Sequence, residues 1–154
     1  MSDHQNASVI SVHYAEIALK GKNRGMFQRQ LRNNIMHALA GEPVDGVNHV
    51  ESRYLVRLGD PEAAERCAEK ISRVFGVQWL SVSEAVPRTD DLEADLARVK
   101  DTAVAMARRD AGASRSFRIN ARRSDRTWAM TSTEINIAVG DVVQPALGID
   151  VQLK

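Results

Sequence analysis

The feature that most constrains the fold is the order of strand-like and helix-like patterns in the first 86 residues. Three segments alternate apolar and polar residues as half-buried strands do: 8–15, 53–58 and 78–86. Between them, apolar residues recur every three or four positions over about 26–40 and 61–74, which predicts two amphipathic helices. The second helix is expected to begin at Asp60 and Pro61, a capping acid followed by a proline that fits the first turn.

These predicted elements follow the order βαββαβ, which is the ferredoxin-like arrangement. Residues 47–51 are the expected hairpin partner of the strand at 53–58, and residues 43–48 have the composition of a turn. In the last strand, Leu80 and Val82 are expected to face the core. The sequence therefore predicts a ferredoxin-like domain over residues 1–86.

Proline and charged residues at 87–91 mark the expected boundary to a second domain, residues 87–154. Its expected elements are a helix to about 110, a strand over 115–122, a helix from about 131 to 148 and a strand over 149–153. Thr131 and Glu134 have the spacing of a capping box. The fold class is therefore α/β (α+β). Because a strand–helix–strand unit needs neighbours at its sheet edges, the second domain is expected to be truncated at its C-terminal end.

Positive charge is concentrated in two segments, although the net charge of the chain is only +1. The first segment, 20–32, contains no acid, and its basic residues are Lys20, Lys22, Arg24, Arg29 and Arg32. The second, 115–126, contains one acid, and its basic residues are Arg115, Arg118, Arg122, Arg123 and Arg126. A glycine-containing basic loop that leads into a helix favours anions, so the first segment suggests phosphate binding. The second segment suggests it because the planar guanidinium of arginine binds phosphate oxygens in pairs.

We predict RNA-binding residues from both segments: Lys20, Lys22, Arg24, Arg118, Arg122, Arg123 and Arg126. Two alternatives are a solvated loop at the first segment and, at the second, salt bridges to the acids of 61–112. Trp128 suits either stacking on an unpaired base or packing at a helix start, and packing is favoured.

No catalytic constellation is recognised. A phosphate loop would need glycine where Glu16 stands and Ser or Thr where Asn23 stands. Cys67, the single cysteine, lies in the apolar stripe of a helix, so an inert buried thiol is expected. No catalytic residue, metal site or cofactor is expected in this chain. Because no signal peptide or membrane-spanning run is recognised, the expected location is the cytoplasm, without a membrane partner.

The segment 9–24 resembles the opening of bacterial tRNA 4-thiouridine sulfurtransferases, a thiamine biosynthesis protein family. The matching residues are Tyr14, Glu16, Lys20, Gly21, Asn23 and Arg24. His13 and Ala15 stand where the family usually has arginine and glycine. Residues 117–126, 131–136 and 139–140 resemble the THUMP domain of the same enzymes, and 148–154 resembles its next strand.

The resemblance implies a tRNA-binding module that grips the acceptor arm and 3′ end. A uridine would then be thiolated by an ATP-pyrophosphatase domain whose loop this sequence lacks. Full-length relatives use ATP and Mg, and sulfur comes from a cysteine desulfurase. By family usage the THUMP domain would start near residue 61. The sequence leaves open whether the chain is truncated or naturally short, and whether it forms a homodimer.

Two other functions remain open from the sequence. One is the front end of a different THUMP-containing enzyme, such as an RNA methyltransferase or a pseudouridine-forming enzyme. The other is a ferredoxin-like ligand-sensing or interaction module. An acylphosphatase-like activity has no supporting residue.

Overall fold

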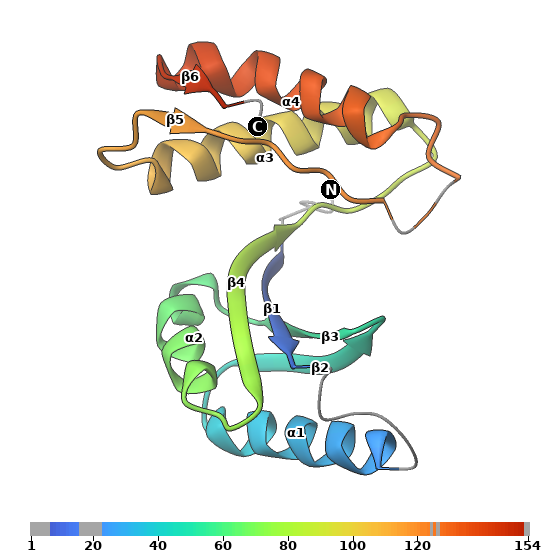
Figure 1. Cartoon of the computed structure of the whole chain (residues 1–154), viewed down its shortest axis with the longest axis vertical. Helices are drawn as coiled ribbons and strands as arrows, with labels where there is room; N and C mark the ends of the chain where they lie inside the picture. Colours follow the sequence, from blue (N-terminus) through green and yellow to red (C-terminus); the bar gives the residue numbers. More distant parts are fainter. Residues whose placement is uncertain (1–6, 16–22, 124, 126, 153–154) are drawn as a thin grey trace. The chain divides into compact units, whose positions relative to one another are not determined.

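The computed structural model describes residues 7–15, 23–123, 125 and 127–152. The chain folds as two compact units, Met1–Ala85 and Val86–Lys154 (Figure 1). Each unit has its own hydrophobic core and is described by itself. No helix in the described ranges is long and apolar enough to cross a membrane.

The first unit is a four-stranded antiparallel sheet with two helices on one face. Its strands are β1 (Ala7–Tyr14), β2 (Val44–Val50), β3 (Arg53–Leu58) and β4 (Val77–Ala85). Its helices are α1 (Arg24–Ala38) and α2 (Ala64–Ser72), the latter preceded by the 3-10 turn η2 (Pro61–Ala63). The strand order is β2-β3-β1-β4, with all pairs antiparallel. The predicted ferredoxin-like arrangement is confirmed.

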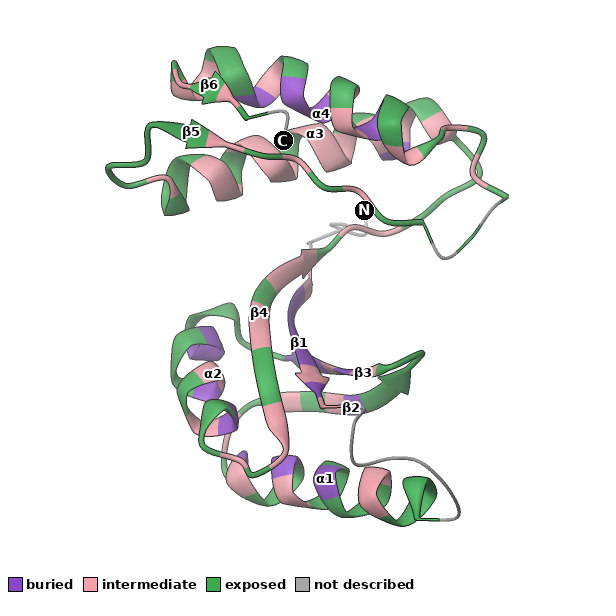
Figure 2. Ribbon diagram, viewed as in Figure 1, coloured by how far each residue is buried: buried purple, intermediate pink, exposed green. Residues whose placement is uncertain are grey.

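The core of this unit lies between the helices and one face of the sheet (Figure 2). Ile10 and Val12 on β1, Val56 on β3, Ile35 on α1 and Ile71 on α2 are all fully buried. Alternate strand positions and every third or fourth helix position therefore meet in one apolar layer, as the sequence periodicity predicts.

Two sequence-based expectations for this unit are corrected. Residues 43–48 are not only a turn, because β2 begins at Val44 and pairs with β3 through a register shift between Val44 and Gly46. The shift accommodates Asp45, which has no partner in the ladder and lies within the segment predicted as a turn. Val82 lies opposite Ile10 but is 37% exposed, because β4 is at the edge of the sheet.

The second unit packs two helices, which run in the same direction, beside a short parallel ladder (Figure 1). Its elements are α3 (Leu92–Asp110), β5 (Ser116–Phe117), α4 (Ser132–Leu147) and β6 (Asp150–Val151). Ile135, Val139 and Val143 of α4 form its buried centre, and apolar residues of α3 pack against them. The capping box at the start of α4 is present as predicted, and Gly148 ends the helix in the left-handed region with φ 65°.

The predicted strand over 115–122 is wrong beyond Phe117, since residues 118–123 have no ladder in the described structure. The alternation itself is preserved, because Ile119 and Ala121 pack on the core while Arg118 and Arg122 are exposed. The amide of Ala121 donates instead to Asn136 Oδ1 on α4, at 2.6 Å. A side-chain acceptor thus replaces a strand partner at this position.

Candidate nucleic-acid interface

The first basic surface lies at the start of α1. Arg24 is the first residue of this helix and is exposed, and no acid occupies the first turn. Arg29 and Arg32 are also exposed, and being three residues apart they share one helix face. The predicted Lys20 and Lys22 lie outside the described residues. Cationic side chains at a helix N-terminus favour an anionic ligand.

A pocket of about 400 Å³ opens beside these arginines, between α1 and β2. Its polar lining includes Gln28, Arg29, Arg32, Asn48 and His49. Arg32 Nε donates to the carbonyl of Val47 at 3.2 Å, which anchors the guanidinium at the rim. Two basic residues that the predicted site left out therefore belong to this surface.

Hydrogen bonds behind the pocket fix the first turns of α1 to the sheet. Tyr14 Oη lies 2.8 Å from His49 Nε2, and Gln28 Nε2 donates to Tyr14 Oη at 3.0 Å. The buried hydroxyl of Tyr54 donates to the carbonyl of Gln28 at 2.6 Å, and burial raises the pKa of Tyr54. The arginines of α1 thus project from a rigid base.

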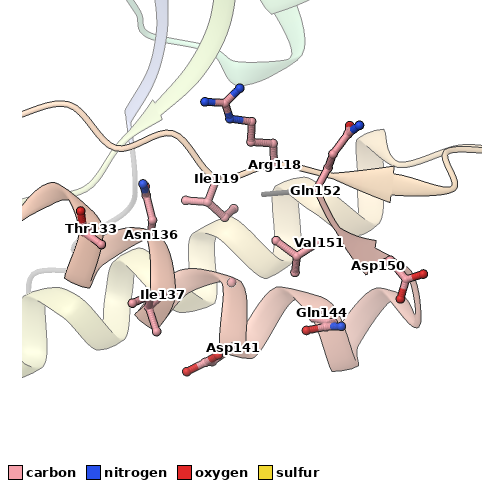
Figure 3. Close-up of a pocket in the computed structure, with 11 residues that line it drawn as sticks. Arg118, Ile119, Thr133, Asn136, Ile137, Asp141, Gln144, Asp150, Val151 and Gln152 are labelled. Carbon is pink, nitrogen blue, oxygen red and sulfur yellow. The ribbon is translucent and has the colours of Figure 1, made fainter. Parts of the chain in front are cut away.

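The second basic surface follows β5. Arg118 and Arg122 are exposed, and neither is paired with a carboxylate among the described residues. Arg118 and Gln152 extend from the β5–β6 side of a pocket of about 830 Å³, whose opposite wall is α4 (Figure 3). The salt-bridge alternative therefore does not hold for these two arginines.

Arg123 has a different environment. Its Nη1 donates to the carbonyls of Trp128 at 3.1 Å and Met130 at 2.8 Å, so it braces the loop before α4. Trp128 is half-buried against the Ile135 cluster, which is the packing role favoured from the sequence. The predicted Arg126 lies outside the described residues.

Asp125, the one acid of this segment, is held within the unit. Its carboxylate accepts bonds from Thr127 Oγ1 at 2.7 Å and Thr127 N at 2.8 Å, and it also pairs with Arg88. These bonds, those from Thr127 first, lower the pKa of Asp125 well below its usual range. Its charge is compensated by Arg88, so it does not neutralise Arg118 or Arg122.

Comparison with known families matches both units. Residues 9–81 match the family described as the ThiI ferredoxin-like domain, and residues 93–154 match the THUMP domain. This chain combines a ThiI ferredoxin-like domain with a THUMP domain. The family resemblance seen in the sequence is confirmed.

Curated relatives of this domain pair carry the name probable tRNA sulfurtransferase. The one from Geobacillus thermodenitrificans (strain NG80-2) is 34% identical over 132 residues, covering 85% of this chain and 31% of the relative. The one from Geobacillus kaustophilus (strain HTA426) is 35% identical over 136 residues, covering 88% of this chain and 32% of the relative. The chain spans about a third of the length of the curated relatives it matches.

Solved structures share the fold of the two domains. PH1313 from Pyrococcus horikoshii Ot3 is 29% identical, with a TM-score of 0.74 over 97% of this chain and 48% of that protein. A 4-thiouridine synthetase, solved as an RNA complex with bound ATP, is 24% identical, with a TM-score of 0.75 over 96% of this chain and 36% of that protein. The second likeness concerns the fold alone.

The thiol of Cys67 and possible metal-binding clusters were the other candidates for a site among the described residues. Cys67 is fully buried, and burial raises the pKa of its thiol, so the reactive thiolate is disfavoured. Within the described ranges of both domains, no group of three or more His, Cys, Asp or Glu side chains could hold a metal ion. The exposed guanidinium groups of Arg118 and Arg122 can bind anions.

Proposed function

We propose that this chain is the tRNA-binding part of a tRNA sulfurtransferase. Two exposed arginines of the THUMP domain, Arg118 and Arg122, carry the proposal, because no described carboxylate neutralises them. Further phosphate contacts would come from Lys20, Lys22 and Arg24 of the ThiI ferredoxin-like domain, and from Arg126. Arg123 would act by positioning the loop, since its guanidinium is bonded to carbonyls. Curated relatives named tRNA sulfurtransferases support this choice of RNA.

Recognition on this proposal depends on shape more than on base sequence. RNA duplexes present phosphates and 2′-hydroxyls, and their base edges are poorly accessible. The chain would grip the acceptor arm and 3′ end in the cytoplasm and position a uridine. Thiolation would be carried out by an ATP-dependent pyrophosphatase domain, with sulfur supplied by a cysteine desulfurase.

The test is the salt dependence of tRNA binding. Contacts to about five phosphates predict a log–log slope of affinity against salt on the order of −3.5 to −4.5. Replacing Arg118 and Arg122 together by alanine should weaken binding and reduce the magnitude of that slope by about 1 to 2. Filter binding of a tRNA transcript across a salt series measures both quantities.

The matched control is Arg73→Ala, which removes an exposed arginine that pairs with Glu69 at 2.5 Å. It removes one positive charge, as each substitution of the double variant does, and it should leave the slope unchanged. An unaltered slope in the Arg118/Arg122 double variant, with its fold intact by circular dichroism, would contradict the assignment. Failure of the parent chain to bind tRNA would refute the proposed function itself.

A further inference from the structure

The face of the four-stranded sheet opposite α1 and α2 carries an ordered row of side chains. Strand register places Trp79 of β4 beside His13 of β1, His13 beside Arg53 of β3, and Arg53 beside Val50 of β2. These positions alternate with Ile10 and Val12, which belong to the core under the helices, so they lie on the face that the helices do not cover. Val9 and Ser11 on this face are nevertheless buried.

An aromatic stack occupies one end of this row. The rings of His13 and Trp79 are 3.6 Å apart at their centroids and inclined by 7°. Ser11 Oγ lies 3.1 Å from His13 Nε2, which holds the imidazole in place. Trp79 is 51% exposed and stands on the edge strand, so its second ring face has no neighbouring strand. This indole is pre-oriented to accept another planar ring.

The centre of the row has an unsatisfied hydrogen-bond donor. Arg53 Nε is buried and has no hydrogen-bond partner, although buried donors are nearly always bonded. Arg57 lies four residues further along β3 on the same face, is exposed, and pairs with no described carboxylate. A ligand that brings an acceptor oxygen or a negative charge would satisfy Arg53.

The rest of the face is also suited to a polyanion. Leu55 lies between the two arginines and Val9 faces Arg57, while the polar residues Ser81, Ser83 and Asn48 are half-buried or exposed on the same face. Exposed aromatic rings beside cations, on a sheet, are the arrangement by which unpaired bases are held through stacking.

We propose that this open sheet face is a separate single-stranded RNA site. An unpaired base stacks on the free face of Trp79, and the adjoining phosphates bind Arg53 and Arg57. The inference rests on the proposed RNA-binding function and adds a contact through bases to the contacts through phosphates.

The test uses the whole chain with Trp128→Phe, which leaves Trp79 as the single tryptophan, excited selectively over the two tyrosines. Titration with a single-stranded eight-nucleotide adenosine RNA should quench the Trp79 emission. Trp79→Ala should weaken binding of this RNA, measured by anisotropy of a labelled strand, by about 5- to 150-fold, the range for loss of one stacked base. Trp79→Phe should restore most of it, and Arg57→Gln, on an exposed side chain, should weaken it independently.

The matched aromatic control is Phe75→Ala, which removes a 90% exposed ring outside the strands and should change nothing. The inference is overturned if the RNA produces no quenching, or if Trp79→Ala and Arg57→Gln bind as the parent does. If such a result accompanies normal, salt-dependent tRNA binding through Arg118 and Arg122, the proposed function stands without this site. If the parent binds neither RNA, both proposals fail.

Discussion

The arginines of this chain differ in whether a carboxylate holds them. Arg66 pairs with Glu42 at 2.9 Å, and Arg88 and Arg98 pair with Asp125 and Asp95. Arg118 and Arg122 have no such partner among the described residues. The paired arginines stabilise the fold locally, so the unpaired ones are the candidates for phosphate.

Folding lowers the pKa of Glu42, so the ionised form of this residue is favoured in the folded state. Its carboxylate accepts bonds from Arg66 and Lys70 of α2, and those bonds, Arg66 first, lower its pKa to about 2. The side chain is only 7% exposed. Because the folded state lowers this pKa, the ionised carboxylate stabilises the fold above the unfolded value of about 4.5, and the stabilisation is lost as pH falls towards 2.

Glu42→Gln should therefore lower the melting temperature at pH 7 and flatten its fall between about pH 4.5 and 2. Thermal unfolding followed by circular dichroism at a series of pH values measures this. Glu69→Gln is the control, since its pair with Arg73 is exposed on both sides and a surface pair contributes little. Equal pH profiles for Glu42→Gln and the parent would show that the ion pairs of Glu42 are not the source of the pH dependence.

At the scale of elements, helix α4 shows how a local sequence signal sets a boundary. Glu134 N donates to Thr131 Oγ1 at 3.2 Å, and Thr131 N donates to Glu134 Oε2 at 2.6 Å. These reciprocal bonds satisfy amides that a helix start leaves open. Because α4 supplies Ile135, Val139 and Val143 to the core, its start also positions the loop braced by Arg123.

Thr131→Ala should remove the cap and lower the free energy of unfolding by about 1 kcal/mol. Urea denaturation, monitored by circular dichroism, gives this difference. Ser132→Ala, one position into the helix and without a capping role, should change stability by less than about 0.5 kcal/mol. A Thr131→Ala variant as stable as the parent would mean that packing alone fixes the start of α4.

At the scale of the whole molecule, the chain contains two cores that share no residue. The cluster around Ile10 and Ile35 belongs to the ThiI ferredoxin-like domain, and the cluster around Val139 belongs to the THUMP domain. Domains with separate cores can unfold separately. Both proposed RNA surfaces therefore belong to units that are stabilised independently.

Ile35→Ala, at a fully buried position, should destabilise the ThiI ferredoxin-like domain by about 2–5 kcal/mol. Hydrogen exchange read by mass spectrometry should then show faster exchange in peptides of residues 23–85 and little change in 92–147. Val139→Ala, with its side chain 3% exposed, is the reciprocal variant and should affect the second range. Loss of protection in both ranges with either variant would indicate a single cooperative unit.

Local physics explains most of what the sequence predicts correctly. The order of elements follows from apolar spacing, because a strand repeats every two residues and a helix every 3.6. Helix starts at Asp60 and Thr131 follow from side chains within one turn of the amides they cap. The candidate basic segments are equally visible, since charge is a property of the residue itself.

Contacts between distant residues decide the rest. A strand extends only as far as its partner, so Val44 joins β2 because it faces Leu58, while residues after Phe117 leave the ladder. Arg123 is engaged because folding brings the carbonyls of Trp128 and Met130 to it. The sequence by itself determined the elements and their order through short-range periodicity. Tertiary structure alone decided which strand residues are paired and which cations remain free, because both depend on the groups that folding places beside them.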